Sequence, residues 1–159
     1  YRPILNETPL PPKNKHPHYS YEREPKTTFA AMVSYMDHNM GLLLAKLEEL
    51  GIADNTLVMF ASDNGAMEEG GHMRASFNSS GELRGGKRDM WGGGIRTPMI
   101  AWWPSKIQPG QVTDHVSAFW DIYPTVRELA GAKAQADTDG ISMVPVLLGQ
   151  GEQATHDNL

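Results

Sequence analysis

The segment TLVMFASDNG, residues 56–65, carries the strongest structural signal in the sequence. Residues 56–61 form a continuous apolar run of large or β-branched side chains, which is typical of a strand buried on both faces of a sheet. The run stops abruptly at Asp63, Asn64 and Gly65. In α/β sheets, ligands bind beyond the carboxyl ends of the strands. The side chains that follow this strand are therefore the first candidates for a functional site.

The segments on either side of this strand predict the fold class. Residues 26–50 place apolar side chains every three or four positions, which predicts one long helix, and Gly51 is the expected stop. Residues 98–103 predict a second buried strand, and residues 121–131 predict a helix with Asp121 as an acidic N-cap. Helix, strand, long loop, strand and helix predict an α/β fold, a layered α/β/α domain with a mostly parallel buried sheet flanked by helices.

The pattern also divides the chain into three regions. Residues 1–25 are rich in proline and lack periodicity, so we predict an irregular connecting segment. Residues 26–150 hold the predicted helices and strands, and residues 151–159 form a tail without a closing feature. We expect a partial domain with a truncated tail, taken from a longer protein.

The composition removes several classes of function. A formal net charge of -5 argues against a broad, charge-driven nucleic-acid surface. No apolar run approaches the roughly 20 residues of a membrane span. The chain has no cysteine, which excludes disulfides, thiolate zinc sites and a cysteine nucleophile within it. We therefore expect no nucleic-acid partner and no membrane span.

The pair Asp63 and Asn64 has the chemistry of a metal site. A carboxylate beside an amide oxygen suits a hard cation such as Ca²⁺ or Mg²⁺. Gly65 lets the backbone turn so that both side chains point into one pocket. The alternative is an ordinary turn, since Asp, Asn and Gly dominate turns, and the tripeptide alone favours that alternative.

The long loop after the strand points to an anionic ligand. Residues 63–96 are polar and contain nine glycines, and a loop of this length in a compact domain is often functional. Glycines allow close backbone approach, and cations among them suit sulfate or phosphate. A solvated basic loop is the alternative, and the spacing of a Walker A loop is absent. Residues 83–96 place four cations among five glycines: Arg84, Lys87, Arg88 and Arg96.

Two further side chains in this loop are candidates for substrate contacts. His72 closely follows the Asp-Asn pair, so a substrate-side or acid–base role is one interpretation, and a surface histidine is the other. Trp91 is the aromatic residue inside the glycine-rich part of the loop, where it could face a substrate.

Four segments of the chain, in this order, carry a family resemblance: AAMVSYMDHNMG, LEELGIADNTLVMFASDNG, GELRGGKRDMWGGGIRTPMIAWWP and SAFWDIYPTVRELAG. Over residues 27–150 the sequence resembles the sulfatases of the alkaline phosphatase-like superfamily. The resemblance implies the C-terminal part of a sulfatase catalytic domain, with Ca²⁺ as cofactor and a sulfated small molecule or glycan as substrate. By position, it implies that Asp63 and Asn64 bind Ca²⁺. It also implies that Lys87 contacts the sulfate group and stabilises the leaving oxygen.

The sequence departs from the family pattern in three places. The family's nucleophile is a formylglycine made from Cys or Ser in a C/S-x-P-x-R motif, and this sequence has no such motif. Gly92 stands where many members have glutamate, and Met67 stands where relatives with DNGxH have histidine. We therefore expect the nucleophile upstream of this chain, and we expect the chain alone to be inactive.

Two alternatives to a sulfatase remain open from the sequence. One is a phosphodiesterase or phosphatase of the same superfamily, although its cluster of His and Asp metal ligands is missing beside Asp63. The other is a non-catalytic module that binds calcium or a sulfated glycan. The habit of the family implies a periplasmic or extracellular location.

Overall fold

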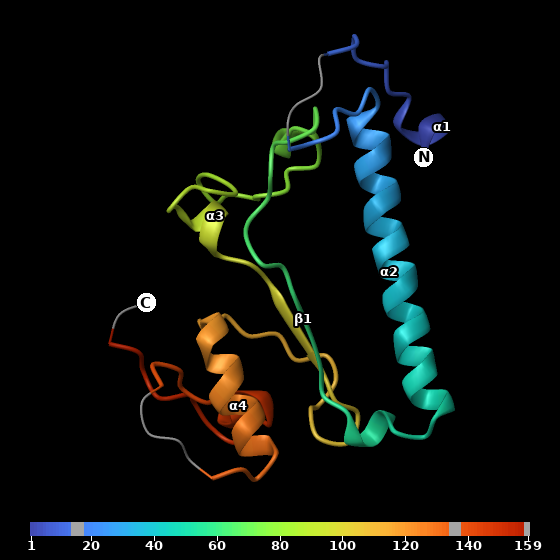
Figure 1. The fold of residues 1–159 in the computed structure, drawn as a ribbon. Coiled ribbons are helices and arrows are strands. Elements are labelled where there is room, and N and C mark those ends of the chain that lie inside the picture. Colours follow the sequence, from blue (N-terminus) through green and yellow to red (C-terminus); the bar gives the residue numbers. More distant parts are fainter. Residues whose placement is uncertain (14–17, 134–137, 158–159) are drawn as a thin grey trace. The chain divides into compact units, whose positions relative to one another are not determined.

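The computed structural model describes residues 1–13, 18–133 and 138–157, and Figure 1 shows the course of the chain. The chain divides into two compact units. Unit 1 comprises Tyr1–Leu50 and Phe60–Ile100, and unit 2 comprises Gly51–Met59 and Ala101–Leu159. Each unit is therefore assembled from two separate stretches of the chain.

The long helix of unit 1 confirms the prediction of one long helix from the periodic apolar residues. Helix α2 spans Pro25–Glu49, with proline in its first turn, and Gly51 follows it with a φ of 67°. Glu7 accepts hydrogen bonds from the backbone N–H groups of Lys26 and Thr27 at 3.0 and 2.8 Å, so it satisfies two free donors of the first turn. A short helix, α1 (Arg2–Leu5), also lies in the segment predicted to be irregular. Glu7 thus caps the long helix, and α1 contacts it.

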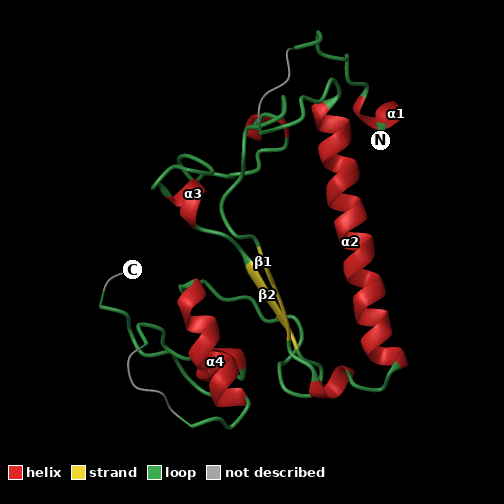
Figure 2. Cartoon of the chain, viewed as in Figure 1, coloured by secondary structure: helices red, strands yellow, loops and turns green. Residues whose placement is uncertain are grey.

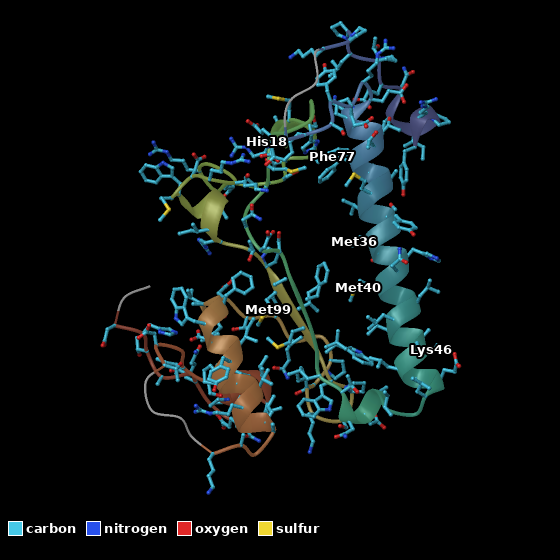
Figure 3. The ribbon with its side chains drawn as sticks, in the orientation of Figure 1. His18, Met36, Met40, Lys46, Phe77 and Met99 are labelled. Carbon is cyan, nitrogen blue, oxygen red and sulfur yellow. The ribbon has the colours of Figure 1, made fainter. Side chains whose placement is uncertain are left out.

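Many apolar side chains of α2 remain exposed in this structure. Figure 3 shows Met36 and Met40 projecting from the helix, and Met36 is 46% exposed. A periodic apolar face on a helix ordinarily packs in a core, and the described residues cover this face of α2 only in part. No helix in the described part of the chain is long and apolar enough to cross a membrane. Other exposed apolar side chains on α2 are Met32, Val33, Tyr35, Leu42 and Leu43.

The two predicted strands are present, but their arrangement differs from the prediction. Strand β1 (Val58–Ala61) pairs with strand β2 (Met99–Trp102), and the two run in opposite directions (Figure 2). A parallel pair needs a crossover connection, usually a helix. The connection here holds only the short elements η2 (Arg74–Ser76) and α3 (Gly92–Ile95). Within the described ranges, the predicted mostly parallel sheet is therefore not confirmed, and its strands are half-buried or exposed rather than buried.

Unit 2 contains the side chains that are most completely buried. Its helices are η1 (Ala53–Asn55), η3 (Phe119–Asp121), α4 (Ile122–Leu129) and α5 (Val144–Leu147). Helix α4 packs against both η3 and α5. The side chains with less than 2% exposure are Met143, Thr125 and Asp121. Two of these three are polar, so the interior of unit 2 depends on hydrogen bonds as well as on apolar packing.

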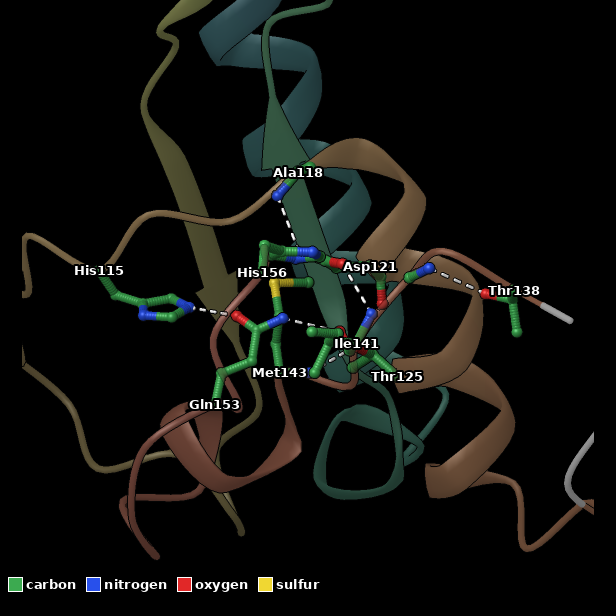
Figure 4. A network of polar contacts seen from close by, with 10 residues as sticks. His115, Ala118, Asp121, Thr125, Thr138, Ile141, Met143, Gln153 and His156 are labelled. Carbon is green, nitrogen blue, oxygen red and sulfur yellow. Dashed lines mark hydrogen bonds and ion pairs between the residues drawn. The ribbon is translucent and has the colours of Figure 1, made fainter. Parts of the chain in front are cut away.

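Asp121 occupies the predicted N-cap position of α4, but its carboxylate does not cap the helix. Oδ2 accepts a hydrogen bond from the Ala118 N–H at 2.9 Å, and Oδ1 accepts one from the Ile141 N–H at 2.8 Å (Figure 4). Nε2 of His156 lies 2.9 Å from Oδ2. Burial alone would raise the pKa of Asp121, and these hydrogen bonds outweigh it and lower the pKa. The carboxylate thus joins three segments of unit 2.

Neighbouring side chains extend this arrangement, which we call the Asp121 network (Figure 4). The Thr125 hydroxyl accepts a hydrogen bond from the Met143 N–H at 2.9 Å. Gln153 donates from Nε2 to the Ile141 carbonyl at 2.7 Å, and its Oε1 lies 2.5 Å from Nε2 of His115. Since the participating residues lie far apart in the sequence, the network holds the loops of unit 2 against α4.

Candidate functional site

The turn after β1 packs backbone to backbone against the glycines before β2. The Gly65 N–H donates a hydrogen bond to the Gly94 carbonyl at 2.9 Å. A Cβ atom on Gly65 would lie 1.7 Å from the Gly93 carbonyl oxygen, far inside any allowed contact. The sequence assigned Gly65 a conformational role, and the structure gives it a packing role as well, because a larger residue would separate the two segments.

The loop that carries Lys87 closes onto both of these segments. The Lys87 N–H donates to the Ala66 carbonyl at 2.8 Å, and the Gly93 N–H donates to the Arg84 carbonyl at 2.7 Å. Asp89 fixes the loop internally by accepting the Gly86 N–H at 2.9 Å. We call residues 63–66, 84–89 and 91–94 together the glycine cradle. The cradle ties the backbone at Lys87 to the segment that directly follows the Asp63–Asn64 pair, and whether these residues form one site stays a prediction.

Asp63 and Asn64 are arranged with one oxygen left over for a ligand. The Asn64 side-chain amide donates to the Asp63 carboxylate. The Asn64 Oδ1 atom is buried and has no hydrogen-bond partner in the described part of the structure. Leaving a buried acceptor unpaired is costly, so such atoms in a native site usually meet a ligand, an ion or water. A free amide oxygen next to a carboxylate fits a hard cation such as Ca²⁺.

These two residues could not form a complete metal site by themselves. The described residues contain no group of three or more His, Asp or Glu side chains that could hold a metal ion. Ca²⁺ takes about six to eight oxygen ligands, which Asp63 and Asn64 cannot supply alone. The pair therefore fits Ca²⁺ chemically and needs further ligands beyond those that the described residues gather.

The cations of the loop differ in their partners. The guanidinium of Arg84 lies 3.6 Å from the ring centroid of Trp91, which is 50% exposed. Arg88 forms an ion pair with Glu69 and donates from Nη2 to the Tyr19 hydroxyl at 2.6 Å. Lys87 forms no ion pair with any carboxylate of the described residues. Of these three cations, Lys87 is therefore the one whose side chain has neither an ion pair nor a ring contact among the described residues.

His72 lies in an aromatic stack rather than at the surface. Its ring centroid is 4.2 Å from that of Phe29, at an interplanar angle of 14°, and 6.2 Å from that of Phe77. The side chain is only 6% exposed, and its Nδ1 atom is buried without a partner among the described residues. Burial lowers the pKa of His72, and the charge of Glu68 offsets this in part. The imidazole is therefore neutral at neutral pH, and its predicted catalytic role stays a prediction.

No pattern in the sequence marked the partners of Arg88. Tyr19 lies 69 positions away from Arg88, in a segment predicted to be an irregular connection. Glu69 was one of several acidic residues in a polar loop, and no spacing marked it. The only usable hint was the abundance of arginine in the same loop, because a partly buried carboxylate requires a cation.

Comparison with known proteins gives consistent matches. A family model described as Sulfatase matches residues 6–132 of the chain. Among curated proteins, steryl-sulfatase from Mus musculus is 40% identical over 131 residues, which cover 80% of this chain and 21% of that protein. The chain thus spans about a fifth of the length of this relative.

Solved structures match as well. One is Ps i-CgsB in complex with k-i-k-neocarrahexaose, with a TM-score of 0.71 and 32% identity over 82% of this chain and 28% of that one. Another was solved in complex with its substrate, D-glucosamine-2-N,6-O-disulfate. It has a TM-score of 0.60 and 32% identity over 75% of this chain and 22% of that one.

Proposed function

The chain belongs to the sulfatase family, and we propose that it supplies part of the active site of an enzyme that hydrolyses sulfate esters. One observation carries the proposal: the Lys87 N–H is bonded to the Ala66 carbonyl, two residues after Asn64, whose Oδ1 has no partner among the described residues. The same cradle would thus bind both an oxyanion and a cation. Asp63 and Asn64 would bind Ca²⁺, and Lys87 would contact the sulfate group.

Each residue then has a defined part in the reaction. When bound, Ca²⁺ supplies Lewis-acid polarisation of a sulfate oxygen. Lys87 presents a compact positive charge, which stabilises the oxygen that leaves as the S–O bond breaks. The backbone contacts of the cradle tie Lys87 to the segment that follows Asn64, which would keep the lysine near the Asp63–Asn64 pair. The nucleophile, the family's formylglycine, would come from a part of the protein outside this chain.

The substrate class follows from the relatives. Two structural neighbours were solved with carbohydrate ligands, one of them a disulfated glucosamine described as the substrate. The curated relative is named for steryl sulfates. We propose a sulfated glycan or small molecule as the substrate and, from the habit of the family, a periplasmic or extracellular location.

The test is turnover by the full-length polypeptide on an aryl sulfate, the matching aryl phosphate and sulfated sugars. We expect Lys87→Ala to lower kcat on the sulfate ester by about 10²–10³-fold, as for loss of one transition-state charge partner. Lys46→Ala is the matched control, because Lys46 pairs only with Glu49 on the exposed side of α2.

Calcium binding gives a second readout of the same site. Asp63→Ala should abolish or strongly weaken Ca²⁺ binding measured by titration calorimetry, while Lys87→Ala should leave it unchanged. Turnover of the phosphate ester alone would instead place the protein among the phosphatases. Full sulfatase activity in Lys87→Ala would refute the role of the lysine.

A further inference from the structure

We propose that Arg88 is a positioning residue that keeps Lys87 available for the sulfate by occupying the carboxylate of Glu69. The inference rests on the proposed function, since it takes Lys87 as the residue that contacts sulfate. Arg88 itself would not touch the substrate. Its effect would be to deny Lys87 a competing partner inside the protein.

Three carboxylates of the loop between β1 and β2 are engaged by other groups. Glu69 forms an ion pair with Arg88, and its side chain is only 8% exposed. Glu68 forms an ion pair with Arg74 at 3.2 Å. Asp89 accepts a backbone hydrogen bond from Gly86.

Glu69 is the carboxylate of these three whose pKa responds to the charge of Lys87. Burial alone would raise the pKa of Glu69, but its contacts with Arg88 and Tyr19 and the charges of Arg88 and Lys87 lower it. Lys87 therefore already feels the charge of Glu69, although it forms no ion pair with it. Arg88 binds this carboxylate through a planar guanidinium and donates to the Tyr19 hydroxyl as well, a geometry that a lysine cannot reproduce.

The backbone of Arg88 is further evidence that its side chain has a specific task. Its φ is 79°, in the left-handed region that favours glycine. Only two other non-glycine residues in the described ranges have a positive φ, and both are asparagines, Asn6 and Asn78, a residue type that tolerates this conformation. Arginine gains nothing from the conformation itself. The contacts of its guanidinium with Glu69 and Tyr19 compensate for the strain.

The decisive experiment is a double-mutant cycle in the full-length protein, on the sulfate ester that the wild type turns over. We expect Arg88→Gln to lower kcat/KM by about tenfold, the size of a coupling within one ion-pair network, because Glu69 then captures Lys87. Glu69→Gln should keep activity within about threefold of the wild type, and so should the double variant, because neither leaves a carboxylate to capture the lysine. A purely structural contact predicts the opposite: Glu69→Gln would be as harmful as Arg88→Gln, and the double variant no better.

Two controls separate the remaining explanations. Arg88→Gly relieves the left-handed backbone and removes the guanidinium, so it should lose as much activity as Arg88→Gln; recovery of activity in Arg88→Gly would overturn the proposal. The NMR signal of the Lys87 side-chain ammonium, followed in each variant, does not depend on turnover. It should shift in Arg88→Gln, where the ammonium pairs with Glu69, and return to the wild-type position in the double variant. An unchanged signal would refute this inference, whereas absence of sulfatase activity in the wild type would refute the proposed function alone.

Discussion

The glycine cradle of unit 1 and the Asp121 network of unit 2 are both polar, yet they use their hydrogen-bonding groups in opposite ways. In the Asp121 network each carboxylate oxygen meets a donor. In the cradle, the Asn64 Oδ1 atom has no partner, and Lys87 has no carboxylate, within the part of the chain that the structure describes. A buried polar group that is fully paired stabilises the fold, and one left unpaired is available to a ligand. The contrast separates a structural centre from a functional one.

The two regions also differ in what holds them together. The Asp121 network is built from side chains, so the identity of each residue matters for its hydrogen bonds. The cradle is held mainly by backbone contacts at glycines, so it does not depend on the Lys87 side chain. Removal of a side chain should therefore affect stability at Asp121 and activity at Lys87.

The strongest effect on stability should come from Asp121→Ala. It removes the acceptor of the Ala118 and Ile141 N–H groups and leaves His156 unpaired, so we expect the free energy of unfolding to fall by about 3 kcal/mol. Chemical denaturation of the full-length protein measures this. Asp114→Ala, at an exposed position of the same unit, is the matched control and should change stability by less than about 0.5 kcal/mol.

The same denaturation experiment on Lys87→Ala completes the comparison. Lys87 has no ion pair to lose among the described residues. The free energy of unfolding of Lys87→Ala should therefore stay within about 0.5 kcal/mol of the wild type. If Asp121→Ala were no more destabilising than Lys87→Ala, the distinction between a structural network and a functional cradle would fail.

A Cβ at Gly65 should damage both stability and activity. In Gly65→Ala the added carbon meets the Gly93 carbonyl oxygen, so we expect a loss of about 1–3 kcal/mol, as in overpacking, and a fall in sulfate turnover as Lys87 moves away. Gly41→Ala is the control, because nothing in the described structure lies within 4 Å of its Cβ position in α2. That change should stabilise the protein by about 0.5–1 kcal/mol. Equal effects of the two substitutions would show that the cradle is not close-packed.

The smallest effect should be a change in the pH dependence of stability in His72→Phe. The pKa of His72 lies below 6.5 in the folded state, so the unfolded chain binds the proton first as the pH falls. The contribution of His72 to the free energy of unfolding is therefore fully present above pH 6.5. This contribution declines as the pH falls from 6.5 toward the pKa of the folded state, with a slope below about 1.4 kcal/mol per pH unit. Phenylalanine should keep the stack with Phe29 and remove this slope, which thermal unfolding between pH 5 and 8 measures.

Turnover by the same variant tests the predicted acid–base role of His72. A loss of about 10²-fold or more in kcat, with the fold intact, would support that role. Retention of activity would assign the residue to the aromatic stack alone.

Local features of the sequence predicted the elements well. Helix α2, its stop at Gly51 and both strands followed from periodicity and from glycine, which act over a few residues. The antiparallel direction of the two strands could not be predicted, because it depends on the path that residues 62–98 take from β1 to β2. That segment has no periodic pattern of apolar residues. The Asp121 carboxylate was assigned to the helix beside it, since two of its partners, Ile141 and His156, lie 20 and 35 positions away in the sequence.

The candidate site was predictable in chemistry but not in construction. The residue types of Asp63, Asn64 and Lys87 pointed to a cation and an oxyanion before any geometry was known. The hydrogen bond between the Lys87 N–H and the Ala66 carbonyl, which joins these residues, left no mark in the sequence because backbone groups are the same everywhere. The same is true of the contact between Arg88 and Tyr19, which are 69 positions apart.

The close packing of the cradle has a genetic consequence. Every single-base change of a glycine codon that alters the amino acid adds a Cβ atom, whatever the chemistry of the new residue. At Gly65, Gly93 and Gly94 that atom would lie 1.7, 2.2 and 2.1 Å from a backbone carbonyl oxygen. Every missense change at these three codons should therefore be harmful. Missense variation in the gene should be depleted there, even though none of the three glycines takes part in the chemistry.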